Sequence, residues 1–262
     1  MNRSYCKNLS ASLSRDLALL KSTFPGTNEY EEIKKLILKS FRPQKLHVLD
    51  IGCGSGKLLY HLETVLRPAG FSISATALDQ DTSQFVFRSP ETRLVEADFM
   101  RYSPESSFDI VLAVHSVYYL GPPKAVLHRI VSICAPAGLT IIIMWSRECT
   151  LFKVGSHLRS LQNLQTPAAE DVFDLAKTLS PSLHVSMSKA ESEVDVAKWV
   201  ANPEIGAAAI RILSRTLDKE LAVSNLPTLL SCLAVPQGFA RRVNGILTIS
   251  REPAKCDERN AL

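Results

Sequence analysis

The sequence predicts an α/β fold in which helices cover both faces of a doubly wound, mostly parallel seven-stranded sheet, with N-terminal helices as a cap. Apolar runs of strand length alternate with helical stretches from about residue 46 onward. The run LTIIIMW at residues 139–145 is apolar at nearly every position, as expected of a strand covered on both faces. A chain of 262 residues with 46% hydrophobic composition can bury such a core.

The predicted elements follow one another regularly along the chain. Leucines at helical spacing predict a helix within residues 4–21, and FPGT separates it from a second helix over 29–41. Strands are expected over 46–51, 72–78, 93–96, 108–114, 139–145, 182–190 and within RRVNGILTIS, and helices over 56–67, 81–88, 122–134, 150–163 and 168–178. We expect residues 1–42 to cap the active site, 43–250 to form the main domain with a helical insertion near 194–233, and 251–262 to be a flexible tail.

Charge and cysteine content give no sign of a nucleic-acid or membrane partner, a zinc site or a disulfide framework. Lys and Arg number 30 against 26 Asp and Glu, and the resulting net charge of +4 gives no indication of a nucleic-acid or membrane partner. The six cysteines are scattered without a C-x-x-C pair, so neither a zinc site nor a disulfide framework is expected. The N-terminus lacks the apolar core and cleavage site of a signal peptide. We therefore expect a cytoplasmic monomer without a metal.

A glycine-rich stretch follows the first predicted strand. Residues 47–56 read HVLDIGCGSG, with glycines at alternate positions, Gly52, Gly54 and Gly56. Glycine has no Cβ, so it tolerates positive φ and allows a ligand to approach the backbone closely. A nicotinamide-type G-x-G-x-x-G motif fails because Lys57 takes the place of its third glycine. A P-loop fails at its first glycine and at its Ser or Thr.

The remaining pattern, D-x-G-x-G-x-G, resembles the nucleotide loop of class I S-adenosylmethionine methyltransferases. The resemblance implies a Rossmann-like methyltransferase fold in which the cofactor's methionine part lies over Asp50 and the three glycines. Asp79 ends the second predicted strand at about the distance from the loop, roughly twenty residues, at which an acid reaches a ribose in a doubly wound fold. A plain tight turn would need only one glycine, so the loop favours a cofactor site.

Three more residues belong to the implied cofactor site. In VEADF, after the third predicted strand, Asp98 stands where this enzyme class commonly bonds the adenine amino group, and its neighbour Phe99 stands where the class packs on the ring. Asp98 can equally cap a turn, since Asp favours caps. Val114, at the end of the fourth predicted strand, completes the expected contacts with the cofactor.

The region after the fourth predicted strand distinguishes classes of methyltransferase. Enzymes that methylate exocyclic amines of nucleic-acid bases carry [DN]-P-P-[YFW] there, whereas this chain has HSVY. Neither the cysteine nucleophile of a cytosine-carbon enzyme nor the metal-binding acids of a catechol-type enzyme is seen. Instead, FDIVLAVHSVYYLGPPKAVLHRIVSI at 108–133 resembles the corresponding region of histamine N-methyltransferases. In that family a polar residue and a Tyr-Tyr pair follow the strand, and His115, Tyr118 and Tyr119 stand at those places.

The same resemblance implies residues elsewhere in the chain. Glu29 and Asn244 match substrate-binding positions of the family, and Gln84 matches a cofactor-binding glutamine. The family's aromatic wall after the fifth strand is reduced here, because Trp145 and Phe152 stand where a pair of tryptophans is expected.

Each substrate residue also has an ordinary explanation. Glu29 lies where an acid complements a helix dipole, and Asn244 precedes a glycine, as in many hairpin turns. The tyrosines could pack at a strand end, and His115 could simply bond a backbone carbonyl. The functional interpretation is favoured because all of these residues fall where one pocket is expected.

The expected function is transfer of a methyl group from S-adenosylmethionine to a small molecule, at an amine or imidazole nitrogen. His115 replaces an amide-bearing residue of the family by a titratable one. An O-methyltransferase with His115 as general base for a hydroxyl is therefore an alternative. A partner subunit that binds the cofactor without turnover is another.

Overall fold

The computed structural model of the chain describes residues 15–16, 19–20, 23, 28–87, 89–161, 163–214 and 238–251. The chain forms two compact units. The first comprises residues 1–28, 144–170 and 189–245, and the second comprises 29–143, 171–188 and 246–262. Most of the predicted helix at 4–21, the end of the helical stretch at 215–233 and the tail beyond residue 251 lie outside the described residues.

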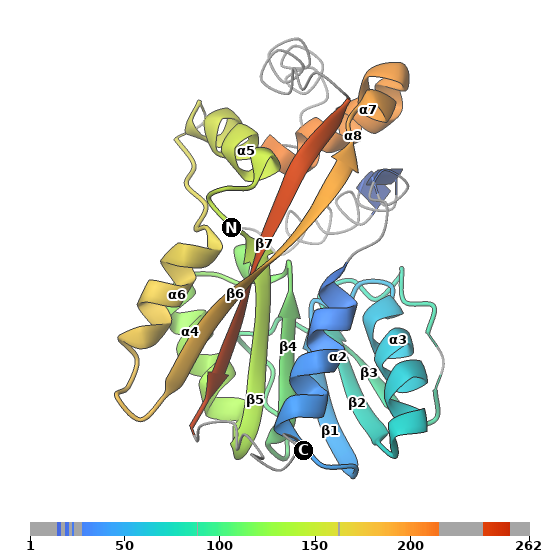
Figure 1. Cartoon of the computed structure of the whole chain (residues 1–262), viewed down its shortest axis with the longest axis vertical. Helices are drawn as coiled ribbons and strands as arrows, with labels where there is room; N and C mark the ends of the chain where they lie inside the picture. Colours follow the sequence, from blue (N-terminus) through green and yellow to red (C-terminus); the bar gives the residue numbers. More distant parts are fainter. Residues whose placement is uncertain are drawn as a thin grey trace, which may run out of the picture. The chain divides into compact units, whose positions relative to one another are not determined.

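A seven-stranded sheet is the centre of the fold (Figure 1). Its strands are β1 (Lys45–Ile51), β2 (Ser72–Asp79), β3 (Thr92–Glu96), β4 (Phe108–Val114), β5 (Cys134–Trp145), β6 (His184–Asp195) and β7 (Phe239–Ser250), in the order β3-β2-β1-β4-β5-β7-β6. The first five pair in parallel. The chain reverses its direction across the sheet at β1, which lies between β2 and β4, and ligands of doubly wound folds bind at the carboxyl ends of the strands at such a point.

The last two strands are antiparallel to each other. The Oγ of Ser186 lies 2.6 Å from Oγ1 of Thr248, while further along β6 Glu191 accepts hydrogen bonds from Arg241. The sheet is therefore mostly parallel, and the predicted fold class is confirmed. Asn244 and Gly245 lie inside β7, so the alternative interpretation of this pair as a hairpin turn is wrong.

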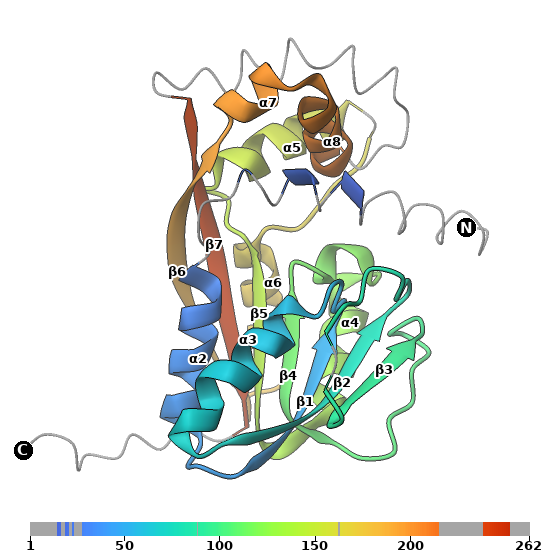
Figure 2. The same cartoon turned by 90° about the vertical axis from the view of Figure 1, so that its right-hand side faces the viewer.

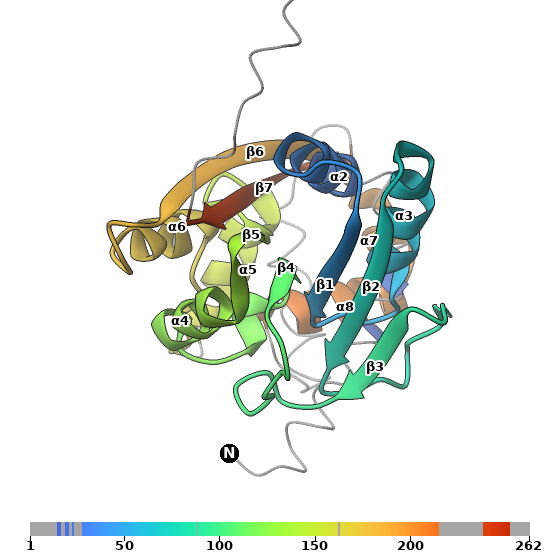
Figure 3. The same ribbon diagram turned by 90° about the horizontal axis from the view of Figure 1, so that it is seen from below.

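Helices flank both faces of the sheet in the second unit (Figure 3). The helices α2 (Asn28–Ser40) and α3 (Lys57–Leu66) lie on one face, and α4 (Pro123–Ile133) and α6 (Ala169–Lys177) lie on the other. The helix α3 begins after Gly56 in the left-handed conformation and buries one stripe of leucines, Leu58, Leu59, Leu62 and Leu66. A 3₁₀ turn, η1 (Arg67–Ala69), follows α3.

The first unit contains α5 (Thr150–Ser160), α7 (Ala197–Ala201) and α8 (Pro203–Ser214), and α8 contacts both of the others (Figure 2). Its apolar core includes Trp199, whose indole Nε1 donates to Oγ1 of Thr23 at 3.0 Å. None of the helices in the described part of the chain is long and apolar enough to cross a membrane.

The helix predicted over residues 81–88 does not form in the described part of that segment, 81–87. Oδ1 of Asp79 accepts a hydrogen bond from the amide of Asp81, and Oδ1 of Asp81 accepts one from the amide of Ser83. Such local bonds from aspartate compete with helix formation. The segment instead contains a turn, in which the amide of Phe85 donates to the carbonyl of Thr82 at 3.0 Å, and Phe85 and Phe87 are buried against the glycine loop. The helical prediction is therefore wrong here.

Candidate active site

The three glycines of the loop between β1 and α3 all have positive φ, but packing restricts only two of them. A Cβ on Gly52 would lie 2.5 Å from Cβ of Ser116, and a Cβ on Gly56 would lie 2.5 Å from the ring of Phe85. A Cβ on Gly54, whose φ is +51°, would meet no described atom within 4 Å. Gly54 therefore borders open space, into which a side chain would project.

The carboxylate of Asp79 holds this loop at the end of β2. Its Oδ2 accepts a hydrogen bond from the amide of Gly54 at 2.9 Å, and the carbonyl of Leu78 accepts one from the amide of Gly52 at 2.7 Å. The open space at Gly54 and the acid predicted to bind a ribose are therefore adjacent.

The carboxyl groups of Asp50 and Asp79 determine the electrostatics of the loop. Asp50 is 3% exposed, and burial, together with the nearby negative charge of Asp79, raises its pKa to about 7. Burial also raises the pKa of Asp79, although the amides that it accepts from oppose this shift. Among the residues that the structure describes, no cationic side chain pairs with either carboxylate. S-adenosylmethionine carries a sulfonium and an ammonium, and two such acids beside open space fit a cationic ligand.

The other predicted cofactor residues lie in less distinctive surroundings. Gln84 is exposed, and Val114 is half-buried at the end of β4. Asp98 is exposed, and its Oδ1 accepts a hydrogen bond from the amide of Met100 at 2.9 Å, so it caps a turn as its alternative interpretation expected. Phe99 is 1% exposed, and the guanidinium carbon of Arg129 lies 5.6 Å from its ring centroid. The adenine contacts of Asp98 and Phe99 stay predictions.

His115 follows β4 and has an unusual backbone conformation. Its φ is +53°, in the left-handed region, while its amide donates to the carbonyl of Ile143 on β5 at 2.9 Å. His115 Nε2 lies 3.0 Å from Oε1 of Glu29 in the first turn of α2. Glu29 is only 4% exposed. The structure thus joins two predicted acceptor residues that lie 86 positions apart in the chain.

The tyrosine pair lies beside this contact, in the 3₁₀ turn η2 (Val117–Tyr119). The ring of Tyr118 is stacked on that of His115, with centroids 6.4 Å apart and planes 12° from parallel. Tyr119 meets Tyr118 edge to face and is 41% exposed. Tyr118 therefore contacts the histidine directly, whereas Tyr119 is one residue further out.

Two predicted acceptor residues belong to the first unit. Trp145, at the end of β5, packs against its apolar core, to which Phe152 of α5 also belongs. Asn244 is 1% exposed within β7. Their roles in binding an acceptor stay predictions.

Two polar side chains that the sequence did not single out lie in this region. The buried Oγ of Ser116 and Oδ2 of Asp81 have no hydrogen-bond partner among the described residues. Ser116 directly follows His115 and touches Gly52, and Asp81 lies two residues after Asp79. The sequence DQD at residues 79–81 places a second acid close to Asp79 and could have indicated Asp81. Nothing in the sequence shows that Ser116 meets the glycine loop.

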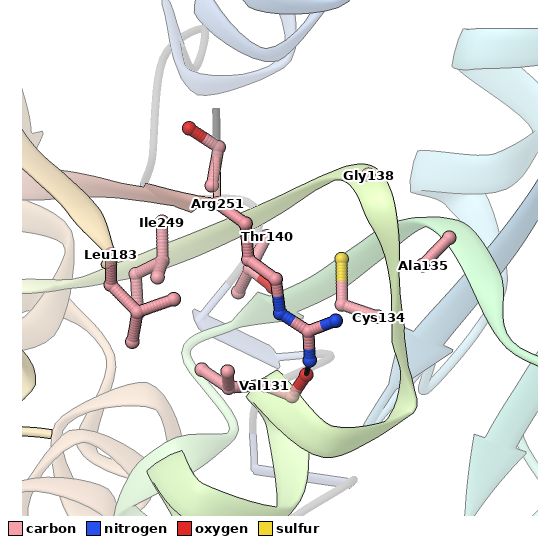
Figure 4. Close-up of a pocket in the computed structure, with 9 residues that line it drawn as sticks. Val131, Cys134, Ala135, Gly138, Thr140, Leu183, Ile249 and Arg251 are labelled. Carbon is pink, nitrogen blue, oxygen red and sulfur yellow. Dashed lines mark hydrogen bonds between the residues drawn. The ribbon is translucent and has the colours of Figure 1, made fainter. Parts of the chain in front are cut away.

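Two hollows of the second unit lie elsewhere. A cavity of about 10 Å³ is lined by residues that include Cys134, Gly138 and Arg251 (Figure 4). Arg251 Nη2 donates across it to the carbonyl of Val131 at 3.2 Å. Its volume gives room for about one water. An open groove of about 380 Å³ runs along the amino-terminal parts of β1 to β3, away from the glycine loop. Neither hollow contains a predicted site residue.

Comparisons with known proteins show the family to which the chain belongs. A family model described as "Methyltransferase domain" matches residues 26–188. The trans-aconitate 2-methyltransferase of Escherichia coli O1:K1 is 27% identical over 101 residues, 37% of this chain and 38% of the relative. A ubiquinone biosynthesis O-methyltransferase of Bradyrhizobium diazoefficiens is 31% identical over 113 residues, 41% of this chain and 43% of the relative. The matches thus span about two fifths of the length of these curated relatives.

Solved structures share the fold over most of the chain. A cyclopropane-fatty-acyl-phospholipid synthase-like protein from Lactobacillus casei has a TM-score of 0.56 at 16% identity, covering 91% of this chain and 98% of its own. The phosphoethanolamine N-methyltransferase 2 of Haemonchus contortus, solved in complex with S-adenosyl-L-methionine, has a TM-score of 0.55 at 16% identity, covering 88% of this chain and 54% of its own. At these identities the likeness shows the fold.

Proposed function

The chain belongs to the methyltransferase-domain family, and from this premise we propose that it transfers a methyl group from S-adenosylmethionine to a small molecule at an amine or imidazole nitrogen. Family membership confirms the predicted enzyme class and the cofactor. The finer resemblance to histamine N-methyltransferases stays a prediction. Support for the nitrogen acceptor has to come from the chain's own residues.

The glycine loop and its acids would hold the cofactor. The open side of Gly54 would receive the methionine part, and Asp79 would accept hydrogen bonds from the ribose. Burial disfavours the charged form of Asp50, and a bound cation would stabilise it. When bound, S-adenosylmethionine supplies a methyl group activated by a positively charged sulfur. The protein contributes alignment and exclusion of water, which can account for much of the rate of an in-line displacement.

The polar cluster after β4 is the observation that carries the proposal. Glu29, His115 and Tyr118 contact one another in series, and Ser116 of the same segment touches Gly52 of the loop. An acceptor bound at this cluster would therefore lie beside the cofactor. A carboxylate and aromatic faces both attract positive charge, which suits a basic acceptor.

A hydroxyl acceptor is the second candidate, because the contact between Glu29 and His115 resembles the pairing that orients a general base. The relatives named as ubiquinone biosynthesis O-methyltransferases make this candidate worth testing, although the match covers only part of their length.

One acceptor that carries both groups distinguishes the candidates. Tyramine, which has a primary amine and a phenol, would be incubated with the protein and S-adenosylmethionine, beside histamine and 4-hydroxybenzoate. Tandem mass spectrometry of the product locates the new methyl group, and formation of S-adenosylhomocysteine measures turnover. Nitrogen methylation supports the proposal, oxygen methylation supports the second candidate, and bound cofactor without turnover on a wider panel of amines, imidazoles and phenols contradicts both.

The proposal includes a monomeric, cytoplasmic enzyme. Cys53, Cys134 and Cys149 are buried and free, which is compatible with a reducing compartment. Size-exclusion chromatography with light scattering tests the monomer.

A further inference from the structure

The contact between Glu29 and His115 suggests that these two residues have different roles in the proposed acceptor site. We infer that Glu29 is a positioning residue that holds His115 as the proton acceptor for a substrate whose attacking atom carries a proton, an ammonium nitrogen or a hydroxyl oxygen. The inference rests on the proposed function and deepens it. Glu29 then acts through His115, whereas the sequence analysis expected it to bind the substrate itself.

The geometry constrains the imidazole from two sides. Oε1 of Glu29 lies 3.0 Å from Nε2, and Tyr118 stacks on the ring at 6.4 Å. With Nε2–H donating to the carboxylate, the lone pair of a neutral imidazole lies on Nδ1, which is shielded from bulk water. A shielded basic nitrogen in a fixed tautomer is the arrangement that general-base catalysis requires.

A helix-terminus role alone does not explain the burial of Glu29. Glu31, in the same first turn of α2, supplies negative charge to the helix N-terminus while its side chain is 49% exposed. The side chain of Glu29 is 5% exposed, and burying a carboxylate is costly unless a donor satisfies it. His115 provides that donor from the end of β4.

The backbone of His115 is also set for this contact. A non-glycine residue at φ +53° is strained, and such strain persists where the surrounding structure imposes it. Asn, Asp and His adopt this region more readily than other non-glycine residues. His115→Asn is therefore the substitution that removes the base while preserving the turn.

The reaction balances with these groups. The N–H or O–H bond of the substrate breaks and its proton passes to Nδ1 of His115, giving an imidazolium whose charge Glu29 stabilises. The freed electron pair forms the new bond to the methyl carbon, and the bond between that carbon and sulfur breaks with its electron pair remaining on sulfur. The proton later leaves His115 for water.

Nitrogen NMR of the full chain with S-adenosylhomocysteine tests the positioning without any substrate. Long-range ¹⁵N–¹H correlations show which ring nitrogen of His115 carries hydrogen. We expect the Nε2–H tautomer in the wild type and in Glu29→Gln, which keeps an acceptor, and a mixture of tautomers in Glu29→Leu, which does not. Glu31→Gln, beside His61 at 3.4 Å, is the matched control and should leave the His115 signals unchanged.

Kinetics with the best substrate of the tyramine panel test the consequence. Glu29→Gln should lower kcat by about ten- to a hundredfold, because the imidazolium formed in the reaction loses a charged hydrogen bond. Cofactor affinity should stay unchanged. His115→Asn should lower kcat at least as far. The inference is overturned if an active wild type shows the Nδ1–H tautomer, or if Glu29→Leu keeps the Nε2–H tautomer and both Glu29 variants keep the kcat of the wild type. A wild type that neither binds cofactor nor methylates any acceptor refutes the proposed function instead, and the tautomer still decides the positioning.

Discussion

The proposed cofactor side and the proposed acceptor side of the second unit are built by different means. Between Asp50 and Asp79, glycine φ angles, one aspartate-to-amide bond and burial shape the site, all within thirty or so residues. At the end of β4, side chains form the site, and its central contact joins Glu29 to His115 across 86 positions. The first side is specified by a local motif, and the second depends on the complete fold.

The largest expected effect tests whether the cofactor side is a backbone site. Gly54→Val should weaken S-adenosylmethionine binding at least about a hundredfold, because the added side chain would occupy the open space beside the loop. Isothermal titration calorimetry measures the affinity, and circular dichroism checks that the sheet survives. Undiminished binding in a folded variant would remove the loop from the cofactor site.

Gly56→Val is the matched control for that experiment. Its Cβ would meet Phe85 and Phe87, so this variant should lose thermal stability first, together with any loss of binding. Equal melting temperatures for the two variants would show that the distinction between packing and ligand space is wrong.

Removing the charge of Asp79 should have the next largest effect. Asp79→Asn keeps an acceptor for the Gly54 amide but loses the charged bonds to a ribose, so Kd should rise about tenfold or more. Asp79→Ala should weaken binding further and also loosen the loop. A Kd that is the same in wild type and both variants would exclude a ribose contact.

The raised pKa of Asp50 predicts a pH dependence of a few degrees in melting temperature. Because its pKa rises to about 7 on folding, the folded protein binds a proton that the unfolded chain has lost between about pH 4 and pH 7. Stability of the cofactor-free protein should therefore fall as the pH rises through this window. Over the same pH range, the melting temperature of Asp50→Asn should fall by a few degrees less than that of the wild type, as measured by scanning calorimetry. The same slope in both proteins would contradict the assignment to Asp50.

The smallest effect concerns the tyrosines of the acceptor side. Tyr118→Phe keeps the ring on His115 and loses one hydroxyl, so KM for the acceptor should change by about two- to tenfold with cofactor affinity unchanged. The more exposed Tyr119→Phe should change KM less. A larger effect at Tyr119 would reverse their order in the site.

The same contrast explains what the sequence could predict. Strand and helix positions follow from local periodicity, and the cofactor loop is a short motif. The segment after Asp79 was mispredicted as a helix because aspartate-to-amide bonds override periodicity there. Family resemblance brought Glu29 and His115 to one site, yet their mutual bond depends on how α2 lies beside β4. The contact of Ser116 with Gly52 likewise exists only in the folded sheet.

The position of α2 ahead of the sheet has a consequence for synthesis on the ribosome. At about 5–20 residues per second, His115 is added roughly 4–17 s after Glu29. During that interval His115 has not been added, so the carboxylate of Glu29 has no imidazole to bond and must stay hydrated. Ile33 and Ile37 are fully buried in the folded protein. Over the same interval no complete sheet is available to cover their side chains. Until the fourth strand emerges, the nascent chain therefore presents apolar surface of α2 to chaperones and to aggregation.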